Sequence, residues 1–366
     1  MTRPASATPL TYQPSFEKPE DGEAETTHSL IETLEKITHT TYQDTNHGLR
    51  GVHAKSHGLL TGEVEVLGNL PPALAQGLFA QPGTYPAVIR FSTVPGDLLD
   101  DKVSTPRAMA IKLIGVPGER VDGGEGDTTQ DFVMVNGPAF GAPDAKHFLK
   151  NLKLLASTTD KGESLKIAFS ALARGTEKLI EGLGGKSGTL IAMGGHPETN
   201  LLGETYYSQV PSLYGPYMAK FSIAPAAPSL KALTDAPVDM KDKPDALREA
   251  VNTYFGQNDA LWELRVQLCT DLEAMPIEDA SVPWPEDKSP FIPVAHIRAA
   301  RQVGWSEARS KAIDDGLSFN PWHSIAAHRP LGSVMRVRKV VYDVMSKIRG
   351  RQNKVGISEP TALPPV

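Results

Sequence analysis

The chain has 366 residues, 22% of them charged and 40% hydrophobic, and its formal net charge is -6 without any basic block, so we expect no nucleic-acid partner. The single cysteine, Cys269, excludes an intrachain disulfide and fits a reducing compartment, so we expect a cytoplasmic protein. No run approaches the roughly 18 apolar residues of a membrane span, and residues 1–19 lack the apolar core of a secretory signal, so we expect neither.

The N-terminal half predicts a helix followed by strands. Residues 1–24 are rich in Pro, Thr and Glu and are expected to form a loose arm. Apolar residues recur at helical spacing over residues 25–41, which predicts a helix. Beyond it, short extended runs separated by Gly and Pro predict strands at 62–68, 86–94, 107–116 and 131–136. Four strands at regular spacing are typical of an antiparallel barrel or sandwich.

The C-terminal half predicts helices with two further strands between them. We expect helices at 144–157, 163–183, 305–313 and 333–350, and strands at 218–224 and 261–272. Ser333 is a good N-cap for the closing helix, and Gly350 is a good stop. A Pro-rich stretch, VPWPEDKSP, predicts a loop over residues 280–293. Residues 351–366 are expected to form an exposed, Pro-rich tail.

The closing helix carries a motif that suits iron chemistry. At about 100° per residue, Tyr342 lies about 40° around the axis from Arg338, and Arg349 lies about 20° from Tyr342, so all three share one stripe. A tyrosine ligates iron as phenolate, and its free pKa of about 10 must fall with the help of nearby positive charge. The alternative is an amphipathic surface helix whose Arg and Tyr side chains are merely solvated.

Two further motifs stand in the N-terminal half, RGVHAKSH at residues 50–57 and RFSTV at residues 90–94. Arg90 and Ser92 are two apart on a predicted strand and therefore share a face. Each piece has a plainer interpretation: His53 as a surface histidine, or Arg90 as a charge that protects a sheet edge. A zinc site formed by His53 and His57, four residues apart, is disfavoured because position 54 is Ala, so the general-base Glu of the H-E-x-x-H motif is absent.

Together these three motifs, in this order, resemble the haem catalases. The short chain is most similar to their trimmed relatives, the catalase-related haem peroxidases or mini-catalases. The resemblance implies an α+β fold, a catalase-like antiparallel β-barrel with surrounding helices and a buried haem b (iron protoporphyrin IX). It also implies that residues 25–350 form a single haem domain. The Tyr-ligated iron of catalases is a known example of how proteins hold haem.

The resemblance implies a role for each motif residue. Tyr342 would be the iron ligand, and Arg338 would bond its phenolate oxygen. His53 would be the acid–base catalyst above the iron, oriented by Ser92. The other expected cofactor contacts are the propionate-binding Arg50, Arg90 and Arg349, and Phe140, which would stack on the haem.

The implied activity is that of a haem-dependent peroxidase, which reduces hydrogen or organic peroxides through a ferryl intermediate at the expense of a small organic electron donor. We expect only weak catalase activity, because catalases carry an Asn before the strand at 131–136. Here Thr128, Thr129 and Gln130 stand in that segment, and which of them replaces the Asn is open. We also expect a homodimer, whereas the identity of the donor and any NADPH site are left open.

Three other functions are weighed against this interpretation. The chain could be a true catalase that disproportionates hydrogen peroxide. A fatty-acid hydroperoxide-converting haem enzyme would carry Thr just before the distal His, whereas this chain has Val52. A non-enzymatic haem carrier would have no need of both His53 and Ser92.

Overall fold

The computed structural model describes residues 8–156 and 196–365, so the predicted helix at 163–183 lies outside the described residues. Within the described ranges the strands are β1 Ser56–Val66, β2 Gly83–Thr93, β3 Arg107–Ile114, β4 Thr129–Val135, β5 Tyr206–Tyr207, β6 Ser212–Tyr214, β7 Tyr217–Pro225, β8 Ala260–Leu268 and β9 Ile292–Ala299. The helices are α1 Glu23–Thr45, α2 Ala145–Ala156, α5 Pro228–Lys231, α6 Ala246–Phe255, α7 Glu307–Arg309 and α8 Ser333–Asn353. A π-helical turn, Ser310–Asp315, follows α7 directly.

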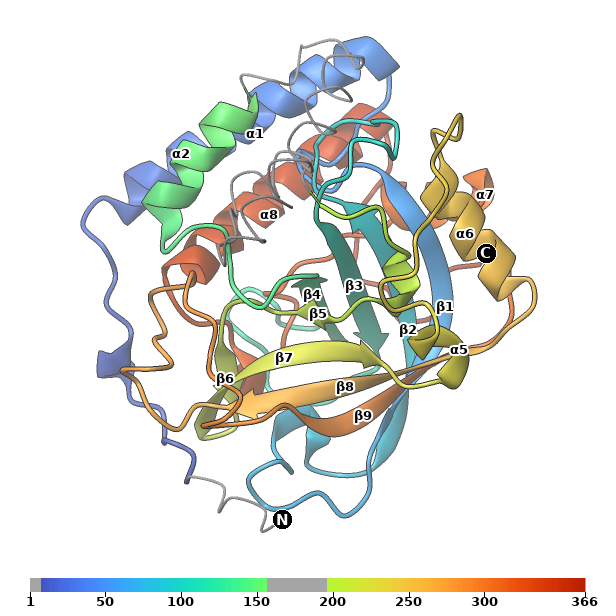
Figure 1. The fold of residues 1–366 in the computed structure, drawn as a ribbon. Coiled ribbons are helices and arrows are strands. Elements are labelled where there is room, and N and C mark those ends of the chain that lie inside the picture. Colours follow the sequence, from blue (N-terminus) through green and yellow to red (C-terminus); the bar gives the residue numbers. More distant parts are fainter. Residues whose placement is uncertain (1–7, 157–195, 366) are drawn as a thin grey trace, which may run out of the picture.

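These strands form one antiparallel sheet in the order β5-β4-β3-β2-β1-β9-β8-β7-β6. β5 pairs with β7 as well as with β4, so the sheet closes into a barrel of 8 strands with β6 outside the ring (Figure 1). Closure leaves no long unpaired edge, which removes the usual aggregation hazard of an open sheet. The prediction of an antiparallel barrel is confirmed.

β2 shows how the alternating sequence builds the barrel wall. Ile89 and Phe91 are fully buried in the apolar core inside the barrel. Because successive side chains on a strand point to opposite faces, Arg90 and Ser92 lie on the outer face. The barrel interior is thus filled by side chains, and the two predicted site residues lie outside it, toward the covering helices.

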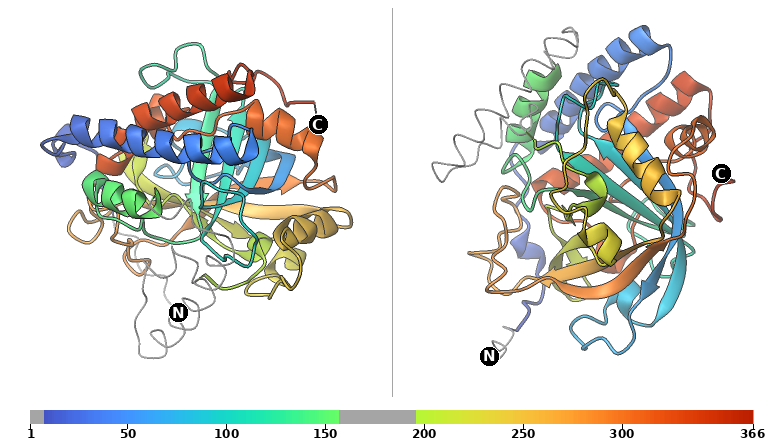
Figure 2. Two further views of the ribbon diagram at one scale, coloured as in Figure 1. Left: turned by 90° about the horizontal axis from the view of Figure 1, so that it is seen from above. Right: turned by 45° about the vertical axis from the view of Figure 1, so that its right-hand side comes forward.

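Three helices cover one side of the barrel and pack against one another. α1 lies beside both α2 and α8, and the three run across the same side of the sheet (Figures 1 and 2). They share a small apolar cluster, here called the helix cluster, made of Leu30, Leu34, Ile37, Ala145, Leu152, Val337 and Val341. α8 is therefore anchored against α1 and, less extensively, against α2, which gives its side chains fixed positions.

Several predicted boundaries differ from the structure for physical reasons. α8 continues past Gly350 to Asn353, and Lys354 ends it in the left-handed region at φ 55°. Gly350 serves close packing instead, because a Cβ there would lie 2.8 Å from the carbonyl oxygen of Val355. β9 falls partly in the predicted loop and was not expected. Its Pro293 stands beside a bulge at Val294 of β9 itself, where a missing N–H is tolerated.

The C-terminal tail returns to the barrel at Glu359. Its carboxylate bonds the Lys112 ammonium and the Thr129 hydroxyl, and it lies 3.1 Å from His323 Nδ1. Lys112 is fully buried and also donates to both oxygens of Asp131, at 2.8 and 2.9 Å. The Glu359 side chain is only 10% exposed. The expectation of an exposed tail therefore does not hold at this residue, while the division into arm, domain and tail stays a prediction.

We expect Glu359→Gln to lower the free energy of unfolding by about 1–3 kcal/mol, the usual range for losing hydrogen bonds between charged groups. The loss should be at the lower end, because Asp131 still pairs with Lys112. Thermal unfolding of the variant checks this. The exposed neighbour Ser358 supplies the control, since Ser358→Ala should leave the melting temperature unchanged.

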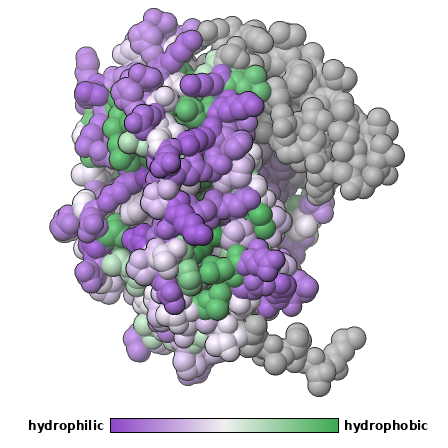
Figure 3. Space-filling view, turned by 90° about the vertical axis from the view of Figure 1, so that its left-hand side faces the viewer, coloured by the Kyte–Doolittle hydropathy of each residue, from purple (hydrophilic) through white to green (hydrophobic). Residues whose placement is uncertain are grey.

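The face turned toward the viewer in Figure 3 is mostly hydrophilic, with hydrophobic residues in small separate groups. Among the described residues, this face therefore offers no broad apolar patch for docking. None of the described helices combines the length and the apolar character that a membrane crossing requires.

Candidate functional site

His53 lies in the loop between α1 and β1, in a backbone conformation that few residues adopt. Its φ is 57°, in the left-handed region, which costs an L-residue about 1–2 kcal/mol. Two hydrogen bonds hold it there: its N–H donates to the Val94 carbonyl at 2.7 Å, and its own carbonyl accepts from Arg90 Nη2 at 2.8 Å. A strained residue that is fixed by its surroundings is typical of functional sites.

The His53 imidazole faces the residue that was predicted to orient it. Ser92 Oγ lies 3.4 Å from His53 Nδ1, a long contact but one that joins the two side chains. Burial, together with the positive charges of Arg90, Arg338 and Arg50, lowers the pKa of His53 to about 3. The imidazole is therefore neutral near pH 7 and has a nitrogen free to accept a proton.

The loop that carries His53 is packed tightly against the turn that follows β2. A Cβ at Gly96 would lie 2.2 Å from the Gly51 carbonyl oxygen, so Gly96→Ala must displace the loop. We expect it to cost about 1–3 kcal/mol of stability, as overpacking usually does, and to reduce the activity that depends on His53. Chemical denaturation measures the first effect. Gly141→Ala is the control, since Gly141 is exposed and a Cβ there meets nothing within 4 Å.

Three predicted propionate ligands converge on the π-helical turn, two of them on the carboxylate of Asp314. Arg50 comes from the His53 loop, Arg90 from β2 and Arg349 from α8. Arg50 Nη1 and Arg90 Nε donate to the same oxygen of Asp314, at 3.0 and 2.7 Å. Arg349 donates to the main-chain carbonyls of Asp314, Asp315 and Leu317 at the end of the π-helical turn. We call these three arginines and Asp314 the arginine cluster.

The arginine cluster contains three positively charged side chains and one negatively charged side chain. Burial and repulsion by Arg90 and Arg349 lower the pKa of Arg50, although Asp314 opposes the change. Burial also lowers the pKa of Arg349, to about 10. Burial alone would raise the pKa of Asp314, but the Arg90 and Arg50 guanidiniums outweigh it and lower the pKa. A ligand that brings further carboxylates would relieve the repulsion among the three guanidiniums.

Tyr342 and Arg338 lie one turn apart on α8 but do not bond each other. The Arg338 guanidinium lies 5.1 Å from the centre of the Phe140 ring, and its Nη1 lies 3.8 Å from Met335 Sδ. Tyr342 is half-buried, and in the described part of the chain its hydroxyl makes no hydrogen bond. The phenol is thus available to a ligand, whereas Phe140 is engaged by Arg338 in this structure.

The helix that bears Tyr342 lies beside the loop that bears His53. The charge of Arg338 contributes to the lowered pKa of His53, so the two are close in space. In addition, Val52 packs against the helix cluster, which includes Val337 and Val341. The structure therefore places the helix of the C-terminal motif beside the loop of the first N-terminal motif.

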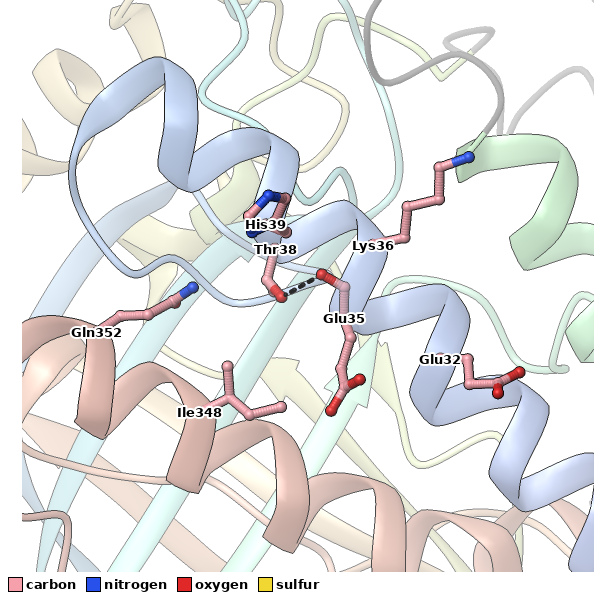
Figure 4. Close-up of a pocket in the computed structure, with 7 residues that line it drawn as sticks. All are labelled: Glu32, Glu35, Lys36, Thr38, His39, Ile348 and Gln352. Atoms are coloured by element: carbon pink, nitrogen blue, oxygen red, sulfur yellow. Dashed lines mark hydrogen bonds between the residues drawn. The ribbon is translucent and has the colours of Figure 1, made fainter.

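Two hollows lie near this region. One, of about 590 Å³, opens between α1 and α8 and is lined by Glu32, Glu35, Lys36, Thr38, His39, Ile348 and Gln352 (Figure 4). The other, of about 20 Å³, lies between β4 and the segment 321–335 and has room for about one water molecule. Neither is lined by His53 or Tyr342. Neither hollow is therefore the predicted position of the haem, which is inferred from the site residues alone.

The three residues predicted to stand in place of a distal Asn, Thr128, Thr129 and Gln130, differ in burial and in bonding. Thr129 is buried and bonds Glu359. Gln130 is buried, and its Oε1 accepts from the Ile325 N–H at 3.0 Å and the Ser324 hydroxyl at 3.2 Å. Thr128 is exposed. Gln130 Nε2 donates to the Asp131 carbonyl at 3.4 Å, and Thr129 has no side-chain amide. Both buried candidates are thus committed elsewhere, and neither offers a free amide in the manner of an Asn.

Sequence reasoning missed Asp314. The residue falls one position beyond the short helix predicted at 305–313, which the structure replaces by α7 and the π-helical turn. The only signal was a pair of acidic residues, Asp314 and Asp315, before Gly316. Such a pair is common at surfaces, so it did not indicate a partner for the arginines.

No protein-family model matches the sequence, and no curated protein matches it. Solved structures do match. A fungal catalase matches with TM-score 0.60 and 15% identity, over 95% of this chain and 66% of that one. A bacterial catalase matches with TM-score 0.57 and 16% identity, over 95% of this chain and 64% of that one. Catalase A from Saccharomyces cerevisiae matches with TM-score 0.56 and 16% identity, over 96% of this chain and 68% of that one.

The chain has the catalase fold. The predicted α+β architecture with a catalase-like antiparallel barrel is therefore confirmed. The chain spans 64–68% of the length of these catalases. At identities of 15–16% the likeness concerns the fold, and the activity has to be argued from the residues of this chain.

Proposed function

We propose that this protein is a haem-dependent oxidoreductase that acts on peroxides, with peroxidase activity greater than its catalase activity. The observation that carries the proposal is that the catalase-like fold joins a neutral His53, oriented by Ser92, to the arginine cluster and to the helix that bears Tyr342. The names of the structural neighbours, all catalases, support a peroxide as substrate.

The donor set fits haem b. Tyr342 offers a phenol oxygen without a partner among the described residues, and phenolate is an established iron ligand. The arginine cluster offers three guanidiniums around one carboxylate side chain, which Arg50 and Arg90 bond and beside which Arg349 bonds main-chain carbonyls. This excess of positive charge suits the two propionates of the cofactor. Arg50, Arg90 and Arg349 would hold those carboxylates, and Arg338 would have to leave Phe140 to reach the phenolate.

The haem would supply the redox chemistry, and the protein would supply position and proton transfer. His53 carries out the proton transfer. Its neutral imidazole would accept a proton from one oxygen of the peroxide and return it to the other oxygen, which leaves as water. Such acid–base catalysis is commonly worth about 100- to 10,000-fold in rate. Ser92 fixes the ring through Nδ1, which leaves Nε2 to face the substrate.

Peroxidase activity is favoured over catalase activity because Thr129 has no side-chain amide and the amide of Gln130 is bonded to the protein at both its oxygen and its nitrogen. Steady-state kinetics with hydrogen peroxide, with and without a phenolic donor, test this. We expect donor oxidation to exceed oxygen release. Fast oxygen release that the donor does not change would indicate a true catalase. Conversion of a lipid hydroperoxide without a donor would indicate a hydroperoxide-converting enzyme instead.

A further inference from the structure

Asp314 is the best-connected side chain in the candidate site. One carboxylate oxygen accepts from Arg50 and Arg90. The other accepts from the Ser56 hydroxyl at 2.7 Å and the Ser310 hydroxyl at 3.0 Å. These partners come from the His53 loop, β2, the start of β1 and the π-helical turn itself. A carboxylate with four hydrogen-bond partners from different segments has little freedom to move, so it can fix the orientation of the side chains that bond it.

Arg50 and Arg90 are bound to Asp314 without using up their donors. A guanidinium has five N–H groups. Arg50 uses Nη1 for Asp314 and Nη2 for the Leu317 carbonyl, whereas Arg90 uses Nε for Asp314 and Nη2 for the carbonyls of the His53 loop. Each arginine therefore keeps donors for a ligand carboxylate while Asp314 holds its orientation.

Asp314 is also connected to the strained backbone at His53. Arg90 Nε bonds the carboxylate, and Arg90 Nη2 bonds the carbonyls of His53 and Ala54, at 2.8 and 3.3 Å. Because a planar guanidinium is rigid, fixing Nε also fixes Nη2. Hydrogen bonds thus connect Asp314 through Arg90 to the backbone of His53. The loop that contains His53 ends at Ser56, which also bonds Asp314.

We propose that Asp314 is a positioning residue, which fixes Arg50 and Arg90 for a ligand with two carboxylates and, through Arg90, fixes the backbone at His53. It acts through other residues and need not touch the substrate. The first half of this claim depends on the proposed function, whereas the second half does not. A π-helical turn suits this role, because such turns are frequent at functional sites.

The test compares Asp314→Asn with Asp315→Asn in the full chain. Asp315 is a matched control, because it carries the same charge one residue away but bonds His47 and Asn353 through its side chain. Two quantities are measured: amide hydrogen exchange in peptides spanning residues 50–56, and the ratio of affinities for haemin and haemin dimethyl ester. The ester lacks the two carboxylates, so a purely structural defect would weaken the binding of both ligands alike.

For Asp314→Asn we expect exchange in residues 50–56 to be roughly tenfold faster. We also expect the preference for haemin over its ester to fall by about 10- to 100-fold, the usual effect of losing a supporting residue. Asp315→Asn should change neither quantity. Unchanged exchange and an unchanged preference in Asp314→Asn, or equal effects of the two variants, would overturn the proposal.

Two outcomes require a different comparison: the unmodified protein binds no haemin, or Asp314→Asn does not fold. If the unmodified protein binds no haemin, the proposed function fails, and exchange in residues 50–56 alone decides the role of Asp314. If Asp314→Asn does not fold, Ser310→Ala takes its place, because it removes one bond to the carboxylate and leaves the charge. Faster exchange in residues 50–56 of Ser310→Ala then supports the proposal, and unchanged exchange contradicts it.

Discussion

Replacing Tyr342 by Phe should remove peroxide turnover and most haem retention. The substitution deletes one oxygen from a half-buried ring and leaves the helix cluster beneath it intact. Losing a residue that only supports a metal ligand costs about 10- to 100-fold, so losing the ligand itself should cost more than about 100-fold in turnover. Haem content after gel filtration, and turnover per haem, measure the two effects.

The matched control for this variant is Tyr85→Phe. Tyr85 is also partly buried, but it lies near the start of β2, away from Arg90 and Ser92 at the other end of the strand. It should keep haem and activity. If Tyr342→Phe behaves like Tyr85→Phe, the phenol of Tyr342 is not the iron ligand, and α8 contributes only its arginines.

Replacing His53 by Gln should lower turnover by about 100- to 10,000-fold while haem is retained, because the variant loses the proton acceptor and keeps a polar side chain of similar size. His39→Gln, on the exposed face of α1, is the control and should have full activity. Retained activity in His53→Gln would favour a haem carrier or a different base.

The pH profile gives a second test of the same residue. The pKa of His53 is lowered to about 3, so the neutral form is present above that value and is lost as the pH falls through it. Turnover limited by His53 should therefore stay level between about pH 5 and 7. An acid limb near the ordinary histidine value of about 6.5 would contradict the assignment of His53, or its burial, in the loaded enzyme.

Local periodicity predicted the parts of the fold that depend on it. β2 was expected because apolar residues alternate along it, and the same alternation put Arg90 and Ser92 on one face. The stripe on α8 followed from helical spacing in the same way. β9 was missed because Pro293 interrupts its start, and the proline is accommodated by a bulge next to it in the pairing of β9 with β8.

Contacts between distant segments could not be predicted from the sequence. Asp314 meets Arg90 across 224 residues and Arg50 across 264. Glu359 meets Lys112 across 247 residues. Nothing in the neighbourhood of either acid indicates its partner, because the barrel closure and the path of the tail decide it. The motifs predicted a group of residues of which Arg50, Arg90 and the His53–Ser92 pair lie together, and the structure adds the carboxylate of Asp314, which holds the two arginines.

The central claim is that the Tyr342 phenolate binds iron on a helix next to the His53 loop. The most direct measurement is the resonance Raman spectrum of the purified protein loaded with ferric haem, recorded beside that of Tyr342→Phe. We predict vibrations of an iron-bound phenolate in the unmodified protein and their disappearance in the variant. A spectrum without phenolate vibrations, or one that the substitution leaves unchanged, would contradict the claim.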